Sequence, residues 1–233
     1  MRKYSYGLFA GLASVAFIII VIGNITIVAQ NAVTGTWKSD SWSDKRTDKH
    51  KSGDDDPLDN TSLKKDENKL HLSFSRNTDG GNRNQFGSGF DYADLQGLTR
   101  EQTQNGNVRF RIVREAGTVE CEGTFTNGKG SGTFRFTPNM SYVEGMKARG
   151  FDFEKAASKR DDGVEERLLS AALINVTTAL ADDLKSVGFG NLDVDDLFKA
   201  AIFKIDSKFM AEMKATGFPD LTMEDLVKAR IFK

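Results

Sequence analysis

The sequence predicts an α+β chain of three parts: an N-terminal membrane helix within residues 1–32, a small antiparallel β domain over residues 33–137 and helical-hairpin repeats over residues 138–233. Three observations lead to this fold class. Residues 8–29 are almost wholly apolar, and apolar and polar residues alternate along several stretches between residues 69 and 137, as is typical of half-buried strands. Residues 177–204 align without a gap on residues 206–233, and such a fixed period indicates a stacked helical unit.

The apolar segment 8–29 is long enough to cross a bilayer core as a helix. Arg2 and Lys3 precede it, and basic residues at that place favour a cytoplasmic N-terminus. We expect a retained signal anchor; a signal peptide cleaved after Ala29 or Ala32 is the alternative. The anchor places the rest of the chain in the bacterial cell envelope, outside the cytoplasm, and cleavage makes it periplasmic or secreted.

The β domain is expected to be a small sandwich or an open barrel. Its first strand contains Val33–Trp37, and a mobile charged loop follows over residues 39–68. A short strand and a helical corner are expected between Phe86 and Leu98, and turns at residues 115–117 and 127–130. The remaining strands have apolar residues at every second position, which we expect to face inward: Leu70, Leu72, Phe74, Val108, Phe110, Ile112, Val119, Cys121, Phe125, Phe134 and Phe136.

Charged residues occupy the outward positions of two consecutive strands. Arg109 and Arg111 alternate with apolar residues in one strand, and Glu120 and Glu122 do so in the next. If these strands pair through the turn at residues 115–117, the opposite charges face each other across the ladder. We expect this pairing rather than an anion-binding patch, and we expect Cys121 to be a buried thiol rather than a nucleophile.

Each repeat predicts two short helices. Gly188 and Gly217 follow the first helix, at the position where a left-handed residue commonly ends a helix. The second helix begins with a capping residue, Asp193 in one copy and Thr222 in the other, with an acid three residues on. A looser first copy spans residues 146–176 and contains about nine extra residues around positions 155–163. Helices this short are stable only when stacked.

The sequence predicts no catalytic residue, no cofactor and no metal site. One cysteine and two histidines are too few for the usual zinc sites, and they do not allow a Ser-His-Asp set to be assembled. The acids around Asp193 lack the glycine and glutamate that an EF-hand calcium loop requires. A net charge of −1 gives no global basic surface for nucleic acid. We therefore expect a non-enzymatic binding or interaction protein.

Gly35 and Trp37, which come soon after the apolar segment, resemble the opening of the lipocalin family. This resemblance implies an alternative function, a carrier that holds a small ligand in the interior of the β domain. The lipocalin barrel has eight strands, however, and this sequence offers fewer.

A wider set of segments resembles a group of uncharacterised bacterial envelope proteins that have a small β domain and Gly-Phe helical repeats. In order, these are Gly35–Trp37, Leu72–Arg76, Asp94–Thr99, Val113–Gly117, Gly130–Thr133, Phe136–Asn139 and the pairs Gly188-Phe189 and Gly217-Phe218. The repeats are also similar to regions attached to membrane peptidases of the β-lactam-sensor type. The His-Glu-x-x-His motif of those peptidases is absent from this sequence, so the resemblance implies a sensory or interaction role and carries over no catalytic residue.

The C-terminal repeat is the predicted interaction site. Leu226, Val227, Ile231 and Phe232 keep the apolar pattern of an internal repeat, whereas the last unit of a stacked array normally has a polar outer face. An exposed apolar face usually marks a docking site. We expect a protein partner or a second copy of the chain to bind there, in addition to the membrane contact through residues 8–29. Packing of the same side chains within the chain is the alternative.

Overall fold

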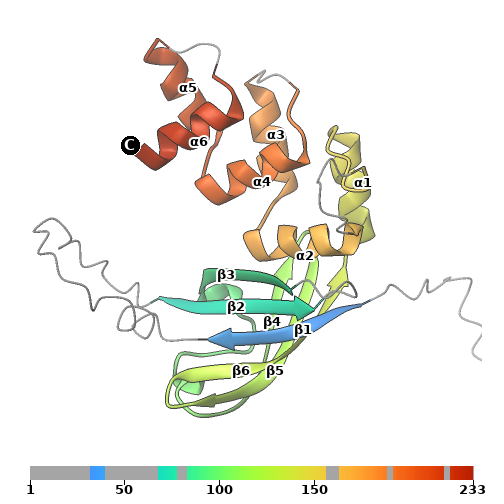
Figure 1. Cartoon of the computed structure of the whole chain (residues 1–233), viewed down its shortest axis with the longest axis vertical. Helices are drawn as coiled ribbons and strands as arrows, with labels where there is room; N and C mark the ends of the chain where they lie inside the picture. The colour runs from blue at the N-terminus through green and yellow to red at the C-terminus, as the bar shows by residue number, and fades with distance from the viewer. Residues whose placement is uncertain are drawn as a thin grey trace, which may run out of the picture.

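The computed structural model describes residues 32–39, 68–77, 83–155, 163–187, 191–217 and 221–232. They form an antiparallel sheet with a stack of helices on one side of it, so the predicted α+β class is confirmed (Figure 1). The strands are β1 (Val33–Ser39), β2 (Lys69–Asn77), β3 (Arg83–Asp91), β4 (Gly106–Arg114), β5 (Gly117–Thr126) and β6 (Lys129–Pro138). The helices are α1 (Met140–Ala148), α2 (Val164–Ile174), α3 (Thr178–Ser186), α4 (Val194–Phe203), α5 (Ser207–Ala215) and α6 (Met223–Phe232).

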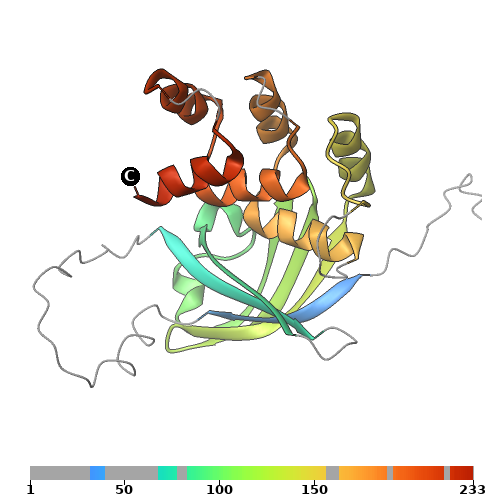
Figure 2. The ribbon, with the colours of Figure 1, turned by 45° about the horizontal axis from the view of Figure 1, so that its top comes forward.

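The described strands form one sheet in the order β3-β2-β1-β6-β5-β4, with every neighbouring pair antiparallel. The sheet curves like half a barrel (Figure 2). Of the two predicted forms, the open barrel therefore describes it and the sandwich does not. The edge strand β3 has 9 residues and is longer than the short strand predicted. The prediction was too short because Gly87 and Gly89 interrupt the apolar alternation that marks the other strands.

The predicted strand register is confirmed. Val119, Cys121 and Phe125 are buried, whereas Glu120 and Glu122 are exposed. Because the side chains of a strand alternate between its two faces, this burial fixes which face of β5 belongs to the core. The turn or helical corner expected at residues 94–98 begins earlier than predicted, with a short 3-10 helix over Tyr92–Asp94.

Trp37 is fully buried on the apolar face of the sheet, where its ring centroid lies 5.3 Å from that of Phe110 and 5.6 Å from that of Phe125. Gly132 makes room for it, because a Cβ atom at that position would lie 2.7 Å from Trp37 Nε1. Aromatic side chains thus occupy the interior that a carrier of the lipocalin type would keep for its ligand. Phe74 and Phe134 belong to the same cluster.

The helices form three consecutive pairs, α1 with α2, α3 with α4 and α5 with α6. Figure 2 shows α1, α3 and α5 in an outer row and α2, α4 and α6 in a row nearer the sheet. The first helix of each pair is capped at an equivalent position, where Asn139, Thr177 and Asp206 accept hydrogen bonds from backbone N–H groups. The side chains of Asp193 and Thr222 cap α4 and α6, as predicted.

Glycines end the first helices as expected. Gly217 has a φ of +95° and Gly150, its counterpart in the looser first copy, has a φ of +91°. Gly188 lies outside the described residues. The second helices end differently, at Asn175 with φ 63° and Lys204 with φ 56°, which hold the same place in successive repeats. Neither is glycine, so the glycine signal predicted where the first helix of a pair ends but not where the second helix ends.

Two predicted segments lie outside the described residues: the apolar segment 8–29 and the charged loop 39–68, apart from Ser39 and Asn68 at its ends. Ser39 is not part of a loop but the buried last residue of β1. Among the helices that the structure describes, none combines the length and hydrophobicity needed to cross a membrane.

Candidate functional site

The four residues of the predicted interaction site do not lie together on the surface of α6. Leu226 and Val227 are buried within the chain, so the prediction that they dock a partner is wrong for these two. They face inward because α6 packs against α4 along this side. Ile231 is 56 % exposed and Phe232 is 85 % exposed. The candidate interaction surface is thereby reduced to the last turn of α6.

Ile231 has a counterpart that the sequence prediction missed. Leu173, Ile202 and Ile231 hold the same position in α2, α4 and α6, but Leu173 is buried whereas Ile202 is 53 % exposed. Because α2 is the helix that packs on the sheet, the sheet accounts for this difference. Ile202 and Ile231 therefore occupy the position that α2 buries, but on α4 and α6 this position is exposed and forms an apolar row. The alignment of the repeats contained the signal, since it places Ile202 on Ile231.

The outer edge of α6 is a second exposed feature, distinct from that row. Lys199 and Phe203 of α4 correspond to Lys228 and Phe232 of α6. The Lys199 side chain is 33 % exposed and that of Lys228 is 67 % exposed; Phe203 is half-buried, unlike Phe232. The edge of α4 is covered by α6, while no described helix lies on the corresponding edge of α6. We call Lys228, Ala229 and Phe232 the open edge.

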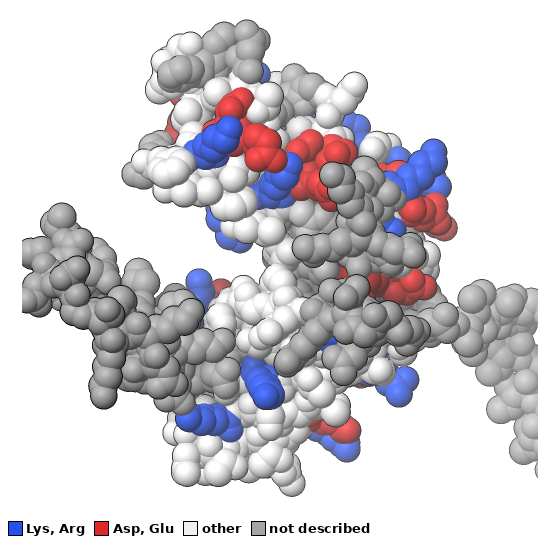
Figure 3. Space-filling model, in the orientation of Figure 1, with Lys and Arg blue, Asp and Glu red and all other residues white. Residues whose placement is uncertain are grey.

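The interface between α4 and α6 shows what such an edge binds. Lys199 Nζ lies 2.6 Å from Glu224 Oε1 of α6, and this hydrogen bond raises the pKa of Lys199. The Arg230 guanidinium donates to the carbonyls of Phe203 and Lys204 at 3.1 and 2.7 Å. These are the last carbonyls of α4, where a helix has negative partial charge. On the face seen in Figure 3, acidic and basic side chains lie side by side over the helical part of the molecule.

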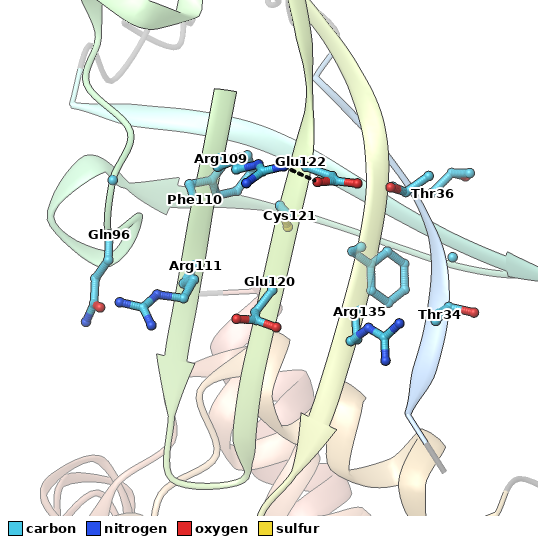
Figure 4. Close-up of a pocket in the computed structure, with 14 residues that line it drawn as sticks. Thr34, Thr36, Gln96, Arg109, Phe110, Arg111, Glu120, Cys121, Glu122 and Arg135 are labelled. Carbon is cyan, nitrogen blue, oxygen red and sulfur yellow. Dashed lines mark ion pairs between the residues drawn. The ribbon is translucent and has the colours of Figure 1, made fainter. Parts of the chain in front are cut away.

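A polar groove of about 940 Å³ lies on the other face of the sheet, away from the core. Figure 4 shows its charged side chains arranged in rows across the strands. One row runs from Gln96 at the sheet edge through Arg111, Glu120 and Arg135 to Thr34, because these residues are register partners from strand to strand. The second row, again made of register partners, contains Arg109, Glu122, Thr133 and Thr36.

The predicted pairing of opposite charges on β4 and β5 is confirmed by this register. Arg109 Nη2 lies 3.5 Å from Glu122 Oε2, with the two side chains 87 % and 62 % exposed. An ion pair this exposed contributes little to stability. The sequence prediction missed Arg135 and the threonines, which reach the groove because β1 and β6 pair across nearly one hundred residues of sequence. The groove holds three arginines against two glutamates.

The single cysteine of the sequence lies on the core side of β5. Cys121 is buried, and burial raises the pKa of its thiol, which keeps it protonated and unreactive. His71 lies on the polar face of β2, beside Gly87 of the neighbouring strand β3. Within the part of the chain that the structure describes, no group of three or more His, Cys, Asp or Glu side chains is arranged to hold a metal ion.

Comparison of the chain with protein-family models, with curated proteins and with solved structures gives no match.

Proposed function

We propose that this chain is a non-enzymatic binding protein of the bacterial cell envelope, anchored in the membrane by residues 8–29, that binds a protein partner through its C-terminal repeat. The single observation that carries the proposal is the exposure of Ile231 and Phe232 in the last turn of α6. Two large, consecutive apolar side chains in the last helix of the array expose surface that water disfavours. Such surface usually marks an interaction site.

The location is proposed on the composition of the N-terminal segment. Its 22 consecutive, mostly apolar residues, with Arg2 and Lys3 before them, suit a helix with a cytoplasmic N-terminus. Cleavage of this segment would instead leave a periplasmic or secreted protein with the same binding end. The resemblance of the repeats to regions attached to sensor peptidases supports a sensory role for the partner contact.

Photo-crosslinking in intact cells tests the proposal. A benzoylphenylalanine placed at position 232 of the full chain is expected to give an adduct of one defined mass after irradiation. The same group at position 208, which is exposed on α5, is the matched control and is expected to give none. If position 232 yields no adduct, the proposed binding end is wrong.

A second candidate function is the binding of an anionic polar ligand in the sheet groove, which the excess of arginine over glutamate favours. Guanidinium groups recognise carboxylate, sulfate and phosphate through paired hydrogen bonds. Calorimetric titration of the full chain with citrate, and with sulfate as a simpler probe, tests this candidate. Arg135→Gln should abolish the binding heat, whereas Lys208→Gln on α5 should leave it unchanged. Absence of heat with both probes removes the candidate.

A further inference from the structure

The contact between α4 and α6 defines a sequence pattern. Met223, Leu226 and Val227 are the buried residues of α6, Glu224 pairs with Lys199 of α4, and Arg230 binds the carbonyls at the end of α4. The helix that covers α4 thus has apolar residues at positions one, four and five, an acid at position two and an arginine at position eight.

The open edge of α6 repeats the surface that this pattern recognises. Lys228 holds the place of Lys199, and Phe232 holds that of Phe203. The partners of Lys228 are correspondingly weaker, because its Nζ lies 3.9 Å from Asp225 of its own helix, whereas Lys199 reaches Glu224 of the next helix at 2.6 Å. A helix stacked on this edge would contact Lys228 and Phe232 at the end of α6, just as α6 contacts the equivalent lysine and phenylalanine at the end of α4.

We propose that the partner inserts a helix with the α6 pattern onto the open edge, as an additional unit of the array. This inference rests on the proposed function and names the chemistry of its partner. The acid of the partner helix pairs with Lys228, its apolar residues cover Ala229 and Phe232, and its arginine binds the carbonyl of Phe232. The interface is continuous with the packing of α4 and α6 and reuses its charge complementarity.

A second copy of this chain is a poor occupant. The pattern is fully present in α6, where the acid and the arginine are already bound to α4. In α4 the eighth position is Ala201, and in α2 it is Ala172. The acid of α2, Glu166, is paired with Arg76 of the sheet. Among the second helices of the described pairs, α2, α4 and α6, none therefore offers an unused face with this pattern, so the occupant we propose is a different protein.

A peptide with the sequence of residues 221–233 is a defined probe for this surface. Because isolated helices of this length are marginal in water, a hydrocarbon staple between positions 225 and 229 holds it helical without replacing a pattern residue. Binding of the labelled peptide to the full chain in mild detergent is measured by fluorescence anisotropy. We expect saturable binding that Lys228→Glu in the protein weakens at least about tenfold, and that Glu224→Lys in the peptide weakens similarly.

The charge swap decides between specific docking and adventitious binding. The variant protein and the variant peptide together should recover binding to within about threefold of the original pair. Lys208→Glu on α5 makes the same charge change elsewhere and should have no effect. Binding that is insensitive to Lys228→Glu, or that the swap does not recover, overturns the proposal. If this happens while the adduct at position 232 persists, the binding end stands and the helix pattern is wrong.

Discussion

The Trp37 indole donates a hydrogen bond from its Nε1 to the Glu122 carbonyl at 3.1 Å and thereby connects strand β1 with strand β5. The two strands are not neighbours, since β6 lies between them. The indole reaches β5 across β6 only because Gly132 of β6 and Gly123 of β5 have no side chains. These two glycines, which are cross-strand partners of each other, therefore determine how closely the indole packs on the sheet.

Gly132→Ala is expected to destabilise the fold. Its Cβ would clash with the Glu122 carbonyl oxygen and would lie 2.7 Å from Trp37 Nε1 and from the Gly123 Cα, and overpacking of this kind typically costs about 1–3 kcal/mol or more. Urea denaturation of the full chain measures the free energy of unfolding. Ser131→Ala, one residue earlier on the exposed face of β6, is the matched control and should change it little. A Gly132→Ala variant as stable as the control would contradict the packing described for Trp37.

Cys121 is expected to make the stability depend on alkaline pH. Burial raises the pKa of the folded thiol above the ordinary value of 9.0, so the thiolate forms first in the unfolded chain. The stability that this group contributes is fully present below pH 9 and decreases as the pH rises above it. Between pH 8 and pH 10 the free energy of unfolding of the wild type should fall by about 1.4 kcal/mol more than that of Cys121→Ala. Equal pH slopes for the two proteins would mean that the thiol is not buried.

Gly217 and Gly145 should respond in opposite directions to replacement by alanine. Gly217 has a φ of +95° with open space around its Cβ position, so Gly217→Ala costs only backbone strain, on the order of 1 kcal/mol. Gly145 lies within α1, where the nearest atom to a Cβ is 3.7 Å away, and alanine there should stabilise by up to about 1 kcal/mol. Chemical denaturation of both variants tests the pair. A stabilised Gly217→Ala would refute the role of this glycine in ending α5.

The sequence predicted local pairings well and distant ones poorly. The β4–β5 hairpin, with Arg109 opposite Glu122 and Arg111 opposite Glu120, could be read from alternation and one turn. The position of β1 between β2 and β6 could not, because nothing near Thr34 indicates that it lies beside Arg135. The 29-residue period likewise indicated which residues are equivalent in successive repeats. It did not indicate that Leu173 would be buried while Ile202 and Ile231 are exposed, since equivalent positions have different neighbours along a finite stack.

Membrane topology is a separate expectation, based on Arg2, Lys3 and the apolar segment 8–29. An alkaline phosphatase fused after Lys233 should be active, because this enzyme matures only outside the cytoplasm. A fluorescent protein that folds only in the cytoplasm should stay dark at the same site. The reverse pattern would overturn the proposed location and leave the structural argument for the binding end intact.

Lysine-reactive crosslinking in intact cells compares the wild-type chain with the Ile231→Ser/Phe232→Ser double variant and tests whether the last turn of α6 binds a partner. Both side chains are exposed, so the double variant should keep its melting temperature, whereas Leu226→Ala, which removes a fully buried side chain, should cost about 2–5 kcal/mol. We predict that the wild type forms a crosslinked complex of defined mass and that the double variant loses it while staying folded. An undiminished complex in the folded double variant would show that the last turn of α6 is not the binding end.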